Sequence, residues 1–180
     1  MTFLRLGICV LDCVISMDRN TDLLQHFLAA LAYRTQKALR GARPEFATFR
    51  AGEKVRTPHE LVCHMNSVIG YAGTFFLGGT YREPQLPDFD TEIERFHSTL
   101  QALSRLIAAE KEWQRITREQ LLQGPLSDAM THAGQLAMLR RLAGDPVPPE
   151  NFIFAEVDGG NLSAEQPLPA RPDKEWPEHP

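Results

Sequence analysis

The feature that most constrains the fold is a helical spacing of apolar side chains, which returns in segments separated by proline and glycine. In residues 21–40, leucine and phenylalanine recur three and four positions apart, so they share one face of a helix. Asn20 is placed to cap this helix and Gly41 to end it. The pattern predicts an amphipathic helix that buries one face.

Capping signals predict two more long helices. Thr57 and Glu60, with a proline at the first helical position between them, form a capping box that starts a helix ending near residue 77. Thr91 and Glu94 offer a second capping box for a helix that ends near Ala109 or a turn later. Both segments carry apolar side chains on one face, so both are expected to pack against the first helix.

A short helix and a fourth long one are predicted further along the chain. Thr117 and Gln120 are placed to cap a short helix that ends at Gly124. The proline that follows Gly124 suits the first turn of a long helix, which continues to Ala143. This last long helix carries Asp128 in its first turn.

The remaining segments are expected to be irregular. Residues 42–57, and the segment that holds Pro84 and Pro87, show neither helical nor strand periodicity. The tail, residues 145–180, is rich in proline. We therefore expect an all-α fold, a four-helix bundle with long crossing loops and an irregular proline-rich C-terminal tail.

The chain of 180 residues has the length of a single domain. Within it, residues 20–144 are expected to form the helical bundle. Residues 145–180 are expected to pack on or near it, with the apolar run 152–154 as an anchor. Residues 1–19 form an additional N-terminal segment, and the sequence leaves open whether translation starts at Met1 or at Met17.

The apolar stretch from Phe3 to Met17 bears on location. Asp12 interrupts it, no small-residue cleavage site follows, and it is too short to span a bilayer. Cys9, Cys13 and Cys63 are too few for a disulfide framework in a chain of this length. We therefore expect a cytoplasmic protein without membrane insertion.

The net charge of the chain limits the kinds of partner that it is expected to bind. With 23% charged residues and a formal net charge of -4, the chain has no basic excess for a phosphate backbone, so no nucleic-acid partner is expected. A small-molecule substrate is expected instead. A homodimer through a helix face is left open, since no long heptad seam is visible.

Three residues form a candidate metal site. Asp128 and His132 are four residues apart, so both project from one face of the last long helix. His64 lies on a mostly apolar segment of the second long helix, where burial requires a hydrogen-bond partner or a metal. His64, Asp128 and His132 would suit one divalent ion, zinc or nickel first and iron or manganese as alternatives, with positions left for water or substrate.

Structural roles compete with this interpretation. Asp128 would also be favoured at the positive end of its helix, and an isolated helical histidine is often a hydrogen-bonded core or surface group. Glu60 could approach the ion as a ligand or base, although the capping box is the better assignment. His59 is expected to be exposed in the first turn, and Cys63 to be a small buried hydrophobe.

Two more histidines, His26 and His97, have no second ligand at suitable spacing. We expect both to be structural or solvent-facing.

The segments RTPHELVCHMNSVIGYA and DAMTHAGQLAMLRRLAG together resemble the DinB/YfiT-like superfamily of metal-dependent four-helix bundles, over roughly residues 20–150. The resemblance implies that the metal ligands are His64, Asp128 and His132, with Asp128 standing where many members have histidine. Gln135, three residues after His132, would hydrogen-bond a ligand or a metal-bound water.

The resemblance also bears on the reaction. Some relatives act as thiol S-transferases that use bacillithiol or mycothiol, and one group isomerises maleylpyruvate. The leading hypothesis is a thiol S-transferase that acts on small electrophiles and uses a low-molecular-weight thiol. A metal-dependent hydrolase and a non-catalytic, stress-related binding bundle are the alternatives.

Overall fold

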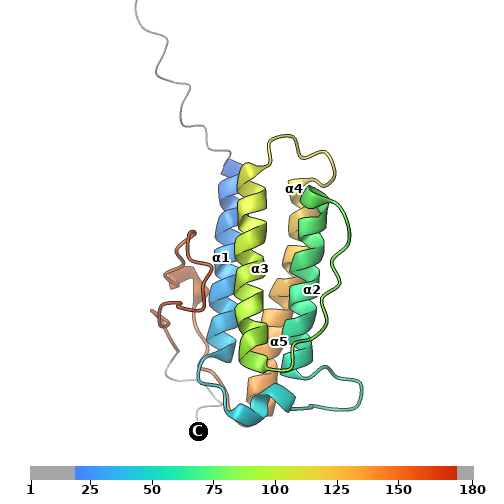
Figure 1. The fold of residues 1–180 in the computed structure, drawn as a ribbon. Coiled ribbons are helices and arrows are strands. Elements are labelled where there is room, and N and C mark those ends of the chain that lie inside the picture. The colour runs from blue at the N-terminus through green and yellow to red at the C-terminus, as the bar shows by residue number, and fades with distance from the viewer. Residues whose placement is uncertain (1–18, 174–180) are drawn as a thin grey trace, which may run out of the picture.

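The computed structural model describes residues 19–173, and its regular structure is helical (Figure 1). The elements are α1 (Arg19–Leu39), η1 (Pro44–Thr48), α2 (Pro58–Leu77), α3 (Phe89–Ala109), α4 (Arg118–Leu121), η2 (Leu122–Leu126), α5 (Ser127–Leu142) and η3 (Phe152–Phe154). Between residues 19 and 173 the only strand-like pairing is an isolated bridge between Glu150 and Pro172. The predicted all-α class is therefore confirmed for this part of the chain.

The four long helices lie side by side around one apolar core (Figure 1). α1 and α5 run in one direction, and α2 and α3 run in the other. α2 packs on α3 and α5, and α1 packs on the same two helices. The core between them holds fully buried side chains from each long helix: Leu28, Leu31, Met65, Ile69, Phe96, Leu100 and Leu136. The apolar faces that helical spacing predicts therefore pack against one another in this core.

The connection from α2 to α3, residues 78–88, crosses back along α2, because the two helices are parallel (Figure 1). A helix of 20 residues is about 30 Å long, and an extended chain covers about 3.3–3.6 Å per residue, so this crossover must be extended. Gly78, with a φ of 78°, begins it in a conformation that favours glycine. The ring of Tyr81 then passes so close to Gly70 that a Cβ there would overlap it.

A buried carboxylate fastens the crossover to the helices. Glu92 is fully buried and accepts hydrogen bonds from the backbone N–H of Leu86 (2.8 Å) and from Nδ2 of Asn66 (2.5 Å). Arg95 pairs with the same carboxylate and donates to the carbonyl of Pro84 at 2.9 Å. The burial cost of Glu92 is therefore offset by charge-assisted hydrogen bonds that hold the loop in place.

The capping predictions hold at two helices and fail at a third. Thr57 and Glu60 form the predicted capping box, as do Thr117 and Gln120 at the start of α4. The predicted Thr91 cap is wrong, because α3 begins earlier, at Phe89, and the side chain of Asp88 accepts from the backbone N–H of Thr91 at 2.9 Å. Both Asp88 and Thr91 can cap a helix, and the earlier start lets the partly buried Phe89 pack against the core.

Two further boundary predictions also need correction. Asn20 does not cap α1, because it lies inside that helix. Gly124 does not end a separate short helix. Instead, a π-helical turn over Leu122–Leu126, with Gly124 at φ −91° and ψ −105°, joins α4 to α5. Pro125 accounts for this local widening, because proline removes an N–H from the helical ladder.

The described part of the tail, residues 145–173, packs on α1 and α3. Leu162 is buried in the core, and its carbonyl accepts a hydrogen bond from Nδ1 of His97 at 2.8 Å. Tyr33 donates from its hydroxyl to Glu150 at 2.7 Å. Within the apolar run 152–154, Phe152 contacts a helix, because its ring packs edge-on against Tyr33 of α1. Ile153, by contrast, is 82% exposed. Residues 145–173 therefore lie against the helices through contacts with α1 and α3.

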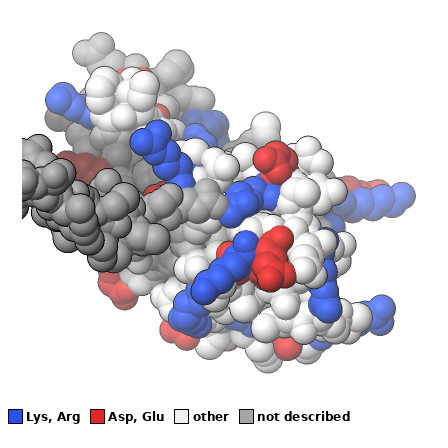
Figure 2. Space-filling view, turned by 90° about the horizontal axis from the view of Figure 1, so that it is seen from above, with Lys and Arg blue, Asp and Glu red and all other residues white. Residues whose placement is uncertain are grey.

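The N-terminal segment discussed above, up to residue 18, and residues 174–180 lie outside the described part of the chain. No described helix combines the length and the apolar character needed to cross a membrane. Seen from above, acidic and basic side chains lie interspersed among uncharged ones, so this face has no dominant charge (Figure 2).

Candidate metal centre

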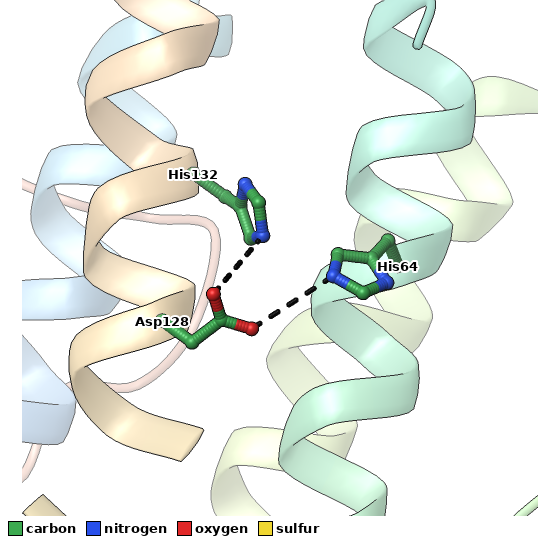
Figure 3. Close-up of side chains that lie close together, drawn as sticks. All are labelled: His64, Asp128 and His132. Carbon is green, nitrogen blue, oxygen red and sulfur yellow. Dashed lines mark ion pairs between the residues drawn. The ribbon is translucent and has the colours of Figure 1, made fainter. Parts of the chain in front are cut away.

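The three predicted ligands come together between α2 and α5, although they lie far apart in the sequence (Figure 3). Asp128 lies in the first turn of α5, and His132 follows one turn later on the same face. His64 projects toward both from α2, which packs against α5. Two helices therefore supply the group.

The distances within this group suit a shared ion better than direct hydrogen bonds. Nε2 of His132 lies 3.4 Å from Oδ1 of Asp128, and Nε2 of His64 lies 3.8 Å from Oδ2. One ligand atom of each residue lies within 4.8 Å of the others. Metal bonds of about 2.0–2.2 Å place ligand atoms roughly 3.4 Å apart in a tetrahedral site. The group could therefore hold a divalent ion after small side-chain adjustments.

His132 is oriented for this role by its neighbour on α5. Its Nδ1 lies 2.7 Å from Oε1 of Gln135, which can only accept, so Nδ1 carries the proton. The lone pair is then on Nε2, which points toward Asp128 and is buried without a hydrogen-bond partner. A metal ion would satisfy this orphaned atom, so the residues present fit the ion.

The electrostatic surroundings keep His64 neutral. Burial lowers the pKa of His64 below its ordinary value, and the nearby charges of Arg56 and His132 lower it further, whereas Asp128 raises it. A neutral imidazole has the lone pair that a metal ligand needs. The carboxylate of Asp128 is itself favoured in the first turn of α5, so the competing structural role and ligation are compatible.

The group opens onto a hollow of about 720 Å³ between α2 and the α4–α5 junction. Side-chain exposure rises from 9% for His132 through 31% for His64 to 48% for Asp128, so the group extends from the interior to the surface. Ser67, Val68 and Tyr71 line one side of the hollow, and Gln123, Pro125 and Thr131 line the other. His64 and Asp128 line this hollow, so a small molecule can reach their side chains from this side.

The other candidate residues do not join this group. Glu60 accepts from the backbone N–H of Thr57 at 2.7 Å and pairs with Arg50, so it serves as a cap. Cys63 is half-buried, and burial followed by the charge of Glu92 raises the pKa of its thiol. It is therefore a weak nucleophile at neutral pH.

The expected exposure of His59 is wrong. His59 is 9% exposed, and its ring lies against Phe89 at 5.4 Å between centroids and 4.0 Å from the carboxylate of Glu92. The start of α3 covers the first turn of α2, which helical spacing alone does not reveal. His97 is buried and hydrogen-bonded, and His26 is exposed, as predicted.

The residues that line the hollow were not among the predicted site residues, although a signal for them was present. Ser67, Val68 and Tyr71 follow His64 at three, four and seven positions, so they share its face of α2. The π-helical turn that provides the opposite side has no such periodic signal, because it depends on how Gly124 and Pro125 distort the helix.

Comparison with protein-family models, with curated proteins and with solved structures gives no match to this chain.

Proposed function

We propose that the chain is a divalent-metal-dependent enzyme of the DinB/YfiT type, a thiol S-transferase that acts on small electrophiles. The observation that carries this proposal is the buried, unpartnered Nε2 of His132, aimed at Asp128 with His64 beside it. The proposed ligands are these three residues, and zinc or nickel suits two imidazoles and a carboxylate. The helix arrangement is compatible with a bundle of that family.

The lining of the hollow favours thiol transfer over hydrolysis. Apart from the proposed ligands, the residues that line it offer no carboxylate or imidazole, and Glu60 is engaged elsewhere. A metal-bound water and a metal-bound thiol could both lose a proton to solvent at the open mouth. Hydrolysis would also call for a group that delivers a proton to the leaving group, whereas a thiolate that displaces a good leaving group needs no such acid.

In the proposed reaction the thiol sulfur forms a bond to an electrophilic carbon, and the leaving group departs with the electron pair of the broken bond. A divalent ion supplies Lewis acidity, which lowers the pKa of a thiol that binds to it. Gln135 holds the tautomer of His132, and α2 and α5 fix the ligand positions. The hollow orients the electrophile beside them.

Metal content measured by mass spectrometry tests the proposal, on the full chain purified without a histidine tag or chelator. We expect about one divalent ion per chain, lost in His64→Ala and in His132→Ala. His26→Ala is the matched control, because His26 is exposed on α1, away from the group, and it should retain the ion.

If the wild type holds no ion even after reconstitution with zinc and nickel, the metalloenzyme proposal is wrong. If the ion is present, activity toward small electrophiles is measured with and without added thiol. Turnover that does not depend on thiol would exclude the transferase assignment while leaving the metal site in place.

A further inference from the structure

The hollow beside His64 and Asp128 has a charge pattern that bears on its ligand. Two neutral imidazoles and one carboxylate would leave a divalent ion with a single uncompensated positive charge. Besides the proposed ligands, the residues that line the hollow carry neither a basic nor an acidic side chain. One negative charge on an incoming ligand would therefore neutralise the remaining positive charge of the ion and its ligands.

The other charged residues near the hollow do not line it, so they are not placed to neutralise a second negative charge on a ligand. Arg56, just before the start of α2, is exposed and does not line the hollow. Glu60 is held by Thr57 and Arg50. A second negative charge on the body of a ligand would thus lie against uncharged side chains, with no counter-charge among the lining residues to offset its lost hydration.

The walls themselves offer apolar surface. Val68 and Pro125 face the hollow with aliphatic groups, and Tyr71 adds an aromatic ring that is 54% exposed. The ring of Tyr71 packs edge-on against Phe75, with 5.0 Å between centroids, which holds it in place. An aromatic or aliphatic ligand body would cover these side chains and gain from their burial.

From these observations we infer that the hollow selects small monoanions, with one thiolate or carboxylate head at the ligand group and an uncharged apolar body against Val68 and Tyr71. This inference rests on the proposed metal-dependent function, because the metal supplies the positive charge.

The test uses the full chain loaded with cobalt(II), whose visible absorption responds to a new ligand. Three carboxylates serve as probes, namely acetate, benzoate and isophthalate. We expect benzoate to bind at least tenfold more tightly than acetate because of its apolar body. We expect isophthalate to bind several-fold more weakly than benzoate because of its second charge.

A pair of variants on α2 locates the body of the ligand. Tyr71→Ala should bring the affinity for benzoate to within about threefold of that for acetate, with cobalt content unchanged. Leu77→Ala is the matched control, since Leu77 is 75% exposed on the same helix and does not line the hollow.

The outcomes separate the two proposals. A chain that takes up no cobalt overturns the proposed metal-dependent function and this inference with it. A cobalt-loaded chain that binds the three probes equally, or prefers isophthalate, overturns the inference alone. The comparison of probes on the wild type decides this even if Tyr71→Ala fails to fold.

Discussion

His97 on α3 joins the tail to the helices through Nδ1, which lies 2.8 Å from the carbonyl of Leu162. Since a carbonyl can only accept, Nδ1 carries a proton. Burial lowers the pKa of His97 below its ordinary value, although the bond to Leu162 and the charge of Glu165 oppose this. Folding therefore favours the neutral ring.

Stability should accordingly fall on acidification in a way that depends on His97. The pKa of the unfolded chain, about 6.5, lies above the folded value, so the unfolded state binds the proton first. The stabilisation is complete above that pH and is lost as the pH falls below it. The loss is at most about 1.4 kcal/mol per pH unit for one proton.

Urea unfolding of His97→Asn at pH 7 and pH 5 measures this contribution. Asparagine can keep the donor to Leu162 and does not titrate, so the variant should lose less stability between the two pH values than the wild type. His26→Asn is the control, because His26 is exposed. An unchanged pH dependence in His97→Asn would contradict the assignment.

Among the elements, the helices were predictable because their periodicity and caps are local. Thr57 with Glu60, and Thr117 with Gln120, cap helices where their spacing indicated. The start of α3 at Phe89 was not predictable by the same means, since Asp88 and Thr91 can both cap a helix and packing of Phe89 decided between them. Local signals identify an element more reliably than they locate its end.

In the candidate site, too, some features could be predicted from the sequence and others could not. His64, Asp128 and His132 could be grouped from spacing and family resemblance, and the structure brings them together. The burial of His59 was missed, because it depends on α3 crossing the first turn of α2. The walls of the hollow depend in part on the distorted turn at Gly124, which no periodic pattern encodes.

Gly70 on α2 makes room for the crossover, and replacing it should destabilise the protein. Alanine is favoured over glycine inside a helix by roughly 0.5–1 kcal/mol. At Gly70, however, the added Cβ would overlap the ring of Tyr81. Overpacking of this kind typically costs about 1–3 kcal/mol, so we expect Gly70→Ala to lower the free energy of unfolding.

Chemical denaturation measures the effect, and Gly73→Ala is the matched control on the same helix. A Cβ at Gly73 would make ordinary contact with Leu106 at 3.7 Å, so this variant should be neutral or stabilising. Adding Tyr81→Ala to Gly70→Ala should recover part of the loss. Equal stabilities for the two alanine variants would show that the crossover does not pass so close to α2.

For the molecule as a whole, the described tail completes the core. Leu162 is 5% exposed and belongs to the cluster formed by the helices, whereas Leu168 in the same tail is 74% exposed. Arg40 on the loop after α1 donates to the carbonyls of Gln166 and Pro167. The tail therefore contributes to the stability of the helices that it covers.

Leu162→Ala should consequently destabilise the whole molecule by about 2 kcal/mol, the lower end for a buried leucine, because the site is at the edge of the core. Leu168→Ala should stay within about 0.5 kcal/mol of the wild type. Thermal unfolding followed by circular dichroism compares them. If both variants melt with the wild type, the tail is energetically separate from the helices.

The division of the proposed ligands between α2 and α5 has a consequence for the order of events during biosynthesis. His64 leaves the ribosome well before Asp128 and His132, so a nascent chain holds only one of the three groups until α5 is synthesised. A single imidazole is a poor competitor for cellular metal. If the proposed site binds a metal, metallation would require that the last helix has docked, and free metal in excess of the dissociation constant would favour finished molecules over partly folded ones.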